Sequence, residues 1–134
     1  MIKKISHIGV AVDNLKEASD FFRENFGLPV SEKEDFGELI FSFIPFNQGS
    51  DLELLQSTTP DGTIAGFIEK KGQGVHHIAF EVDDIQAELD SLKARGLKLI
   101  NEEPYLNAHK DLVAFIHPKS TYGILVELVQ HKQE

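Results

Sequence analysis

The stretch HIGVAVDN at residues 7–14 decides the fold, because HIAFEVDD at residues 77–84 repeats its pattern. Each stretch begins with histidine and ends on acidic or amide residues. Between them, every second residue has a larger apolar side chain. Such alternation predicts a β-strand whose apolar side chains share one face. His7 and His77 fall on the opposite face, so the same strand is expected twice, 70 residues apart.

A helix is expected after each of these strands, at about 14–27 and 83–96. Asx residues followed three positions later by Glu or Gln indicate the helix starts, and glycines indicate the ends. The starting pairs are Asn14 with Glu17 and Asp83 with Gln86, and the terminating glycines are Gly27 and Gly96.

Three further strands are expected in each half of the chain. The segments are about 28–33, 38–46 and 51–57 in the first half, and 97–101, 111–117 and 123–130 in the second. LELLQ at 52–56 corresponds to VELVQ at 126–130, so the repeat extends to the last strand of each half. FNQGSD at 46–51 is a turn by composition, and the polar end QHKQE at 130–134 is expected to fray.

The pattern therefore predicts an α+β fold made of two βαβββ modules. We expect one domain over residues 1–134, with modules at about 1–60 and 75–134. TIAGFIEKKGQG at 63–74 is expected to link them as a short helix followed by glycines.

Composition narrows the function classes. The 134 residues include 13 basic and 22 acidic side chains, for a formal charge of −9, and no cysteine. An acidic chain is a poor partner for nucleic acid or an anionic membrane. The absence of cysteine, and of an apolar run long enough to cross a bilayer, favours the cytoplasm.

Each module carries one histidine and one glutamate at matched strand positions, namely His7, Glu53, His77 and Glu127. A lone strand histidine is more often a hydrogen-bonded structural residue, but the recurrence of the pair favours a shared role. Two neutral imidazoles and two carboxylates suit one divalent ion such as Co²⁺, Mn²⁺, Ni²⁺ or Zn²⁺.

The sequence resembles the vicinal oxygen chelate superfamily, which includes glyoxalases, bleomycin resistance proteins and dioxygenases. Within it, the similarity is to the methylmalonyl-CoA epimerase branch. Three stretches carry this similarity beyond the His/Glu pairs: GVHHIAFEVDDI at 74–85, AFIHPKS at 114–120 and GILVEL at 123–128. The resemblance implies that the two modules form a curved mixed sheet around a metal-binding cavity, as in glyoxalases. It also implies a metal held by the four residues named above, and a homodimer.

The resemblance also implies the chemistry: inversion of carbon 2 of methylmalonyl-CoA through a metal-stabilised enolate. Glu127 is a candidate for both base and ligand, and Glu38 is the second candidate base. Lys119 and Ser120, in the HPKS loop, are candidates for holding a carboxylate or part of the CoA chain.

Two alternatives remain open from the sequence. A glyoxalase I-like isomerase (lactoylglutathione lyase) would use the same four positions on a glutathione hemithioacetal. A non-catalytic, antibiotic-sequestering protein would use the same cavity for binding alone. The chain also departs from the epimerase pattern at 106–110, where a Gly-His-Gly-like turn is common, and at Tyr122–Gly123, where Gly-Gly is common.

Overall fold

The computed structural model describes residues 1–46 and 49–132. Its contacts divide the chain into two compact units. The first unit comprises residues 7–76, and the second comprises residues 1–6 and the chain from residue 77 onward. The first strand, β1 (Ile2–Ala11), contributes residues to both. The assignment of the whole chain to one domain stays a prediction.

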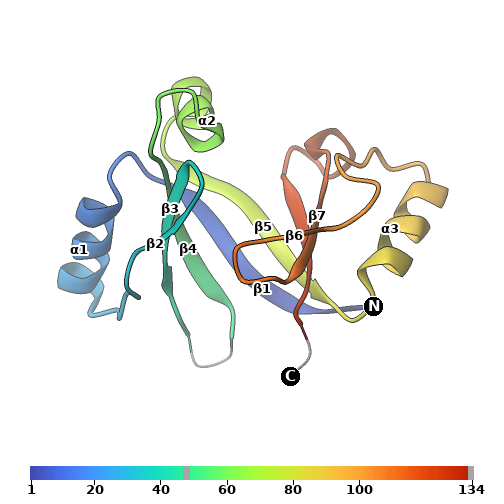
Figure 1. Ribbon diagram of the computed structural model, residues 1–134, viewed down its shortest axis with the longest axis horizontal. Helices are drawn as coiled ribbons and strands as arrows, with labels where there is room; N and C mark the ends of the chain where they lie inside the picture. Colours follow the sequence, from blue (N-terminus) through green and yellow to red (C-terminus); the bar gives the residue numbers. More distant parts are fainter. Residues whose placement is uncertain (47–48, 133–134) are drawn as a thin grey trace. The chain divides into compact units, whose positions relative to one another are not determined.

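The first unit has the predicted order of strand, helix and three strands, followed by a linking helix (Figure 1). After β1 come α1 (Leu15–Phe26), β2 (Glu34–Phe36), β3 (Leu39–Ile44), β4 (Asp51–Ser57) and α2 (Thr63–Lys71). The strands lie in the order β2-β3-β4-β1. Neighbours are antiparallel except β1 and β4, which are parallel.

The second unit repeats this arrangement. Its elements are β5 (Gly74–Val82), α3 (Ile85–Ala94), β6 (Tyr105–Leu106), β7 (Leu112–Ile116), the 3₁₀ turn η1 (Pro118–Ser120) and β8 (Val126–Gln130). The order is β5-β8-β7-β6, with β5 and β8 parallel and the other pairs antiparallel. The α+β class and the βαβββ repeat are therefore confirmed.

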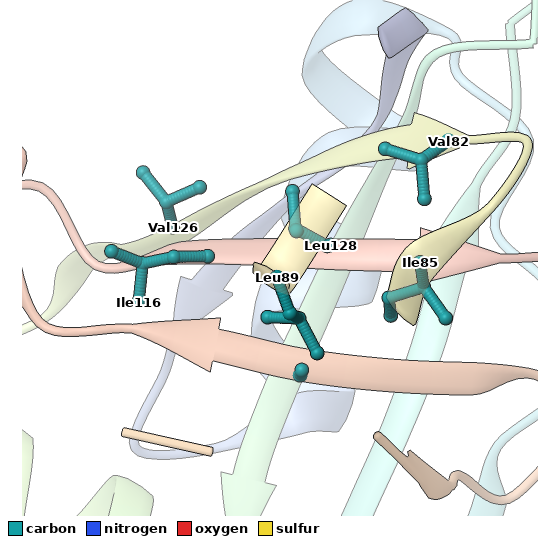
Figure 2. Close-up of a cluster of buried hydrophobic side chains, with 7 residues drawn as sticks. Val82, Ile85, Leu89, Ile116, Val126 and Leu128 are labelled. Carbon is teal, nitrogen blue, oxygen red and sulfur yellow. The ribbon is translucent and has the colours of Figure 1, made fainter. Parts of the chain in front are cut away.

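Each helix covers the face of its own strands that the histidines do not occupy. In the first unit α1 packs on β3 and β4 around buried Val12, Leu15, Ile44 and Leu54. In the second unit α3 packs on β7 and β8, where Ile85 and Leu89 lie among strand side chains such as Leu128 (Figure 2). Burying these apolar faces stabilises each module and leaves its other face for polar groups. No helix in the described ranges is both long and apolar enough to cross a membrane.

The helix ends follow the predicted capping, with one correction. The Asn14 side chain accepts the Glu17 N–H at 3.0 Å, and α1 ends at Gly27, whose φ is 66°. In α3, however, Asp84 rather than Asp83 is the N-cap, because Asp84 has the extended backbone that an N-cap needs and accepts the Ala87 N–H at 3.1 Å.

A second helix-start contact is the same in both modules. The Gln56 side-chain oxygen accepts the N–H of Leu15 at 2.7 Å, and the Gln130 oxygen accepts the N–H of Ile85 at 2.9 Å. These N–H groups belong to the first residues of α1 and α3, which have no partner within the helix. The final strand of each module therefore fixes where the helix begins.

Two predicted strands are wrong. Residues 28–33 and 97–101 run beside β3 and β7, but isolated backbone bonds, such as that from the Ser31 N–H to the Phe43 carbonyl at 2.8 Å, are combined with side-chain contacts instead of forming a regular ladder. The Ser31 hydroxyl accepts the Phe43 N–H at 2.8 Å, and the Asn101 side-chain oxygen accepts the Phe115 N–H at 2.9 Å. Within the described residues, the isolated antiparallel bridge between Leu99 and Ile116 is the only β-bridge that these two segments form. The outer strands form later, as β2 and β6.

Parts of two further expectations lie outside the described residues: the centre of the turn at 46–51, which is Asn47 and Gln48, and the last two residues of the tail. His131, expected to be solvated, lies with Nδ1 3.0 Å from a carboxylate oxygen of buried Asp111. The backbone N–H of Lys132 donates to the same carboxylate. These contacts hold the start of the tail against the second unit.

We predict that Gln130→Leu lowers the free energy of unfolding by about 1–3 kcal/mol, because the half-buried Ile85 N–H loses its acceptor. Chemical denaturation of the variant and the wild type measures the difference. Gln86→Leu is the matched control, since the Gln86 side chain contacts only exposed Asp90 one turn along α3. Equal stability of the two variants would contradict this role for Gln130.

Candidate metal centre and its surroundings

In the first unit, His7 and Glu53 form a pair on neighbouring parallel strands. His7 Nε2 lies 3.5 Å from Glu53 Oε1, and each side chain is 13% exposed. Gly9 lies opposite Glu53 in the register of β1 and β4, so no side chain fills the space between them. The parallel pairing therefore brings together two residues that are 46 positions apart in the sequence.

The second unit contains the equivalent pair, more deeply buried. His77 Nε2 lies 3.0 Å from Glu127 Oε1, and the side chains are 6% and 7% exposed. Ala79, which is fully buried, takes the place of Gly9 opposite Glu127. In each unit the predicted residues thus meet with an imidazole nitrogen facing a carboxylate oxygen, and both groups are metal-ligand types.

One phenylalanine ring contacts the histidine of each pair. Neither phenylalanine was among the site residues predicted from the sequence. Phe43 lies opposite Glu53 in the register of β3 and β4. Its ring meets the His7 ring edge-on, with 6.4 Å between the ring centroids. Phe115 lies opposite Glu127, and the centroids of the Phe115 and His77 rings are 5.9 Å apart. A sequence pattern could have identified both residues, because a phenylalanine occurs in the strand that precedes the final strand of each module. The edge-on contacts restrict how the imidazoles can turn.

The Glu38 side chain contacts the start of α2. It belongs to the turn that joins β2 and β3, and its Oε1 accepts the N–H of Thr63 at 3.2 Å. Gly62, the N-cap of α2, has no side chain to perform this role. The Ser57 hydroxyl accepts the Ala65 N–H at 2.9 Å, so two side chains from elsewhere cap α2. A carboxylate at a helix N-terminus is a stabilising structural contact.

Lys119 and Ser120 lie in the 3₁₀ turn that follows β7. The Lys119 backbone N–H donates to His117 Nδ1 at 3.0 Å, and the Lys119 side chain is exposed. The Ser120 hydroxyl accepts the Lys98 N–H at 2.8 Å. The HPKS loop is therefore held in one shape by its own side chains, while the ammonium group of Lys119 faces solvent.

The two departures from the epimerase pattern coincide with unusual backbone. Lys110 and Tyr122 are the non-glycine residues with positive φ in the described part of the chain, at 65° and 59°. Both lie in the two stretches that depart from the expected pattern, and glycine would adopt this conformation without steric cost. At the first site the Asn107 side chain accepts the Asp111 N–H at 2.9 Å and helps hold the turn. At that site a side-chain contact therefore supports a turn that places a non-glycine residue at positive φ.

Tyr105 is a further polar residue on the face that carries His77 and Glu127. It lies opposite Val113 on β7, and Val113 packs with Ala79 and Val129 on this face. Burial, and to a lesser degree the Glu127 carboxylate, raises the pKa of the Tyr105 phenol. The phenol therefore keeps its proton and can donate a hydrogen bond. The segment was not predicted as a strand, so no sequence pattern pointed to Tyr105.

The chain matches known proteins over nearly its whole length. The model of the Glyoxalase/Bleomycin resistance protein/Dioxygenase superfamily matches residues 6–115. The mitochondrial methylmalonyl-CoA epimerase of Mus musculus is 39% identical over 129 residues, which cover 95% of this chain and 72% of the mouse protein. The ethylmalonyl-CoA/methylmalonyl-CoA epimerase of Cereibacter sphaeroides is 38% identical over 136 residues, which cover 97% and 99%.

The fold is also found among solved structures. A variant of Streptomyces coelicolor methylmalonyl-CoA epimerase in complex with 2-nitronate-propionyl-CoA has a TM-score of 0.90 to this chain and 29% sequence identity. The match covers 99% of this chain and 100% of the Streptomyces chain. The similarity in three dimensions therefore extends through both βαβββ modules.

We predict that Glu127→Gln lowers the pKa of Tyr105 by removing a nearby negative charge. The value should stay above the ordinary tyrosine value of about 10, because burial also raises it. Ultraviolet titration of tyrosinate in protein treated with a chelator measures the shift. Tyr105→Phe identifies which of the two tyrosines titrates. An unchanged Tyr105 pKa in Glu127→Gln would contradict the proximity of the two groups.

Proposed function

Because the chain belongs to the glyoxalase/bleomycin resistance/dioxygenase superfamily and, within it, to the methylmalonyl-CoA epimerase family, we propose that it inverts carbon 2 of methylmalonyl-CoA. The observation that carries the proposal is the His–Phe–Glu arrangement found in both units, together with similarity to named epimerases along 95% of the chain. Carbon 2 lies between a thioester and a carboxylate, so its proton is unusually acidic for one on carbon.

We propose that His7, Glu53, His77 and Glu127 hold one divalent ion, of the kind Co²⁺, Mn²⁺, Ni²⁺ or Zn²⁺. The donor chemistry fits: each unit offers one imidazole nitrogen and one carboxylate oxygen, largely shielded from water. Gly9 and Ala79 keep bulk away from the carboxylates. When bound, such an ion supplies Lewis acidity toward the thioester and carboxylate oxygens of the substrate.

The chain's own residues perform the proton transfer and the positioning. A carboxylate removes the proton from carbon 2, and return of a proton to the opposite face inverts the centre. Glu127 is the preferred candidate base; Glu38 is the weaker one, because its carboxylate already accepts the Thr63 N–H. Lys119 supplies a positive charge for the substrate carboxylate or the CoA phosphates, and Ser120 can donate its hydroxyl proton.

We also propose a cytoplasmic homodimer whose only partner is a small thioester of the CoA or glutathione type. The dimer follows from superfamily analogy. The formal charge of −9 disfavours nucleic acid and membrane as partners. It is compatible with a small anionic molecule that a local basic group holds.

The proposal predicts metal-dependent exchange of the carbon 2 proton of methylmalonyl-CoA in D₂O. Supplied with Co²⁺, the protein should exchange this proton much faster than the buffer does, and a chelator should remove the exchange. Nuclear magnetic resonance of the substrate follows the loss of the proton signal. Absence of exchange by protein shown to contain metal would reject the epimerase proposal, and a glutathione hemithioacetal would then be the substrate to test.

Each His–Glu pair is expected to be necessary for tight metal binding. His7→Ala and His77→Ala each remove one nitrogen donor and should lower the metal content measured after dialysis to less than about a tenth, since neighbouring carboxylates cannot replace the imidazole. His109→Ala is the control, because His109 lies in the turn before β7 and is exposed. Full metal content in both variants would show that the pairs do not hold the ion.

A further inference from the structure

A tyrosine of the second unit lies on the face that carries the His77–Glu127 pair. We propose that Tyr105, on β6, donates its hydroxyl proton in a hydrogen bond to the free carboxylate of the bound thioester, and so determines which acyl group is bound. The inference rests on the proposed epimerase function and adds to it a residue that gives specificity for a carboxylated thioester. Tyr105 takes no part in the transfer of the carbon 2 proton.

The strand registers place Tyr105 on this face. Phe115 lies opposite Glu127, and its ring contacts the His77 ring, so Phe115 projects to the face of the pair. Val113 lies two residues before Phe115 on β7 and therefore projects to the same side. Tyr105 lies directly opposite Val113 in the antiparallel pairing of β6 and β7, and directly opposed residues share a face.

The turn after β6 holds Tyr105 in a defined position, although the strand has only two residues. The Asn107 N–H donates to the Asp111 carbonyl at 3.0 Å. The Asn107 side-chain oxygen accepts the N–H groups of His109 and Asp111 at 3.0 and 2.9 Å. These contacts close the turn between β6 and β7 and fix the register that carries Tyr105. A group that binds a ligand selectively needs such a fixed support.

The Tyr105 hydroxyl is available as a donor. Within residues 1–46 and 49–132, no protein group forms a hydrogen bond with it, and the residue is 45% exposed. Burial raises the pKa of the phenol, and the Glu127 carboxylate raises it further, so the hydroxyl keeps its proton at neutral pH. The hydroxyl can therefore bind a substrate oxygen without giving up a contact with the protein.

The free carboxylate of the substrate is the acceptor that suits this donor. A carboxylate has about four lone-pair sites on its two oxygens, and contact with the proposed ion uses only part of them. The remaining sites need donors when the substrate leaves water, and a hydrogen bond to an ionised oxygen is stronger than one to a neutral oxygen. The neighbouring side chains of Ala79, Val113 and Val129 form an apolar cluster and cannot donate.

This assignment also separates the roles of Tyr105 and Lys119. Lys119 lies in the turn η1 with its side chain exposed, whereas Tyr105 lies on the face of the His77–Glu127 pair. An exposed ammonium group suits the CoA phosphates, which are far from carbon 2 in the substrate. The carboxylate on carbon 2 is then left for the tyrosine.

The test compares two ligands that differ in the carboxylate alone, methylmalonyl-CoA and propionyl-CoA. Isothermal titration calorimetry of the metal-loaded protein measures both dissociation constants, with methylmalonyl-CoA supplied as the equilibrated mixture of epimers so that turnover does not change its composition. Tyr105→Phe should raise the dissociation constant of methylmalonyl-CoA about 10- to 100-fold and that of propionyl-CoA less than about twofold. A merely structural role would weaken both ligands together.

Tyr122→Phe is the matched control, because Tyr122 is the other tyrosine of the chain and is fully exposed. It should leave both dissociation constants unchanged, and the metal content of both variants should equal that of the wild type. Lys119→Ala should weaken the two ligands by similar factors, since both carry the CoA phosphates.

Two results would overturn the inference while leaving the epimerase proposal intact. One is an unchanged preference for methylmalonyl-CoA over propionyl-CoA in Tyr105→Phe, and the other is equal weakening of the two ligands in that variant. Binding of neither ligand by the metal-loaded wild-type protein would overturn the proposed function and this inference together.

Discussion

Parallel hydrogen bonding between the first and last strands of each module is the constraint on which the rest depends. It sets Gly9 opposite Glu53 and Ala79 opposite Glu127. Each glutamate therefore lies near the histidine that precedes this glycine or alanine by two residues. Parallel neighbours cannot be joined by a tight turn. The helix and the two outer strands are the connection that this pairing requires, and the helix covers the apolar face.

The same pairing explains why the two modules resemble each other in detail beyond the ligands. In both, a glutamine at the end of the last strand accepts the first N–H of the helix, and a phenylalanine on the third strand lies against the histidine. Such contacts fix the helix and the imidazole to one strand register. A slip of one residue would turn the glutamate to the helix-covered face, where a carboxylate is costly.

The outer parts of the modules are less constrained, and here the two copies have diverged. The offset between equivalent residues grows from 70 at His7 and His77 to 74 at Glu53 and Glu127. The second module places two non-glycine residues, Lys110 and Tyr122, at positive φ. The outer strands carry Glu34 in one module and Tyr105 in the other.

The sequence by itself determined the repeat, the α+β class, the histidine-bearing faces and the residues that form each His–Glu pair. These follow from period-two alternation and from contacts repeated in both halves, which are local patterns. The tertiary structure alone decided where the outer strands form, since the Ser31 and Asn101 side chains accept the N–H groups of distant phenylalanines, and regular backbone pairing begins only at β2 and β6. It also decided that the Glu38 side chain caps α2, because this contact joins residues 25 positions apart in the sequence and no local pattern specifies it.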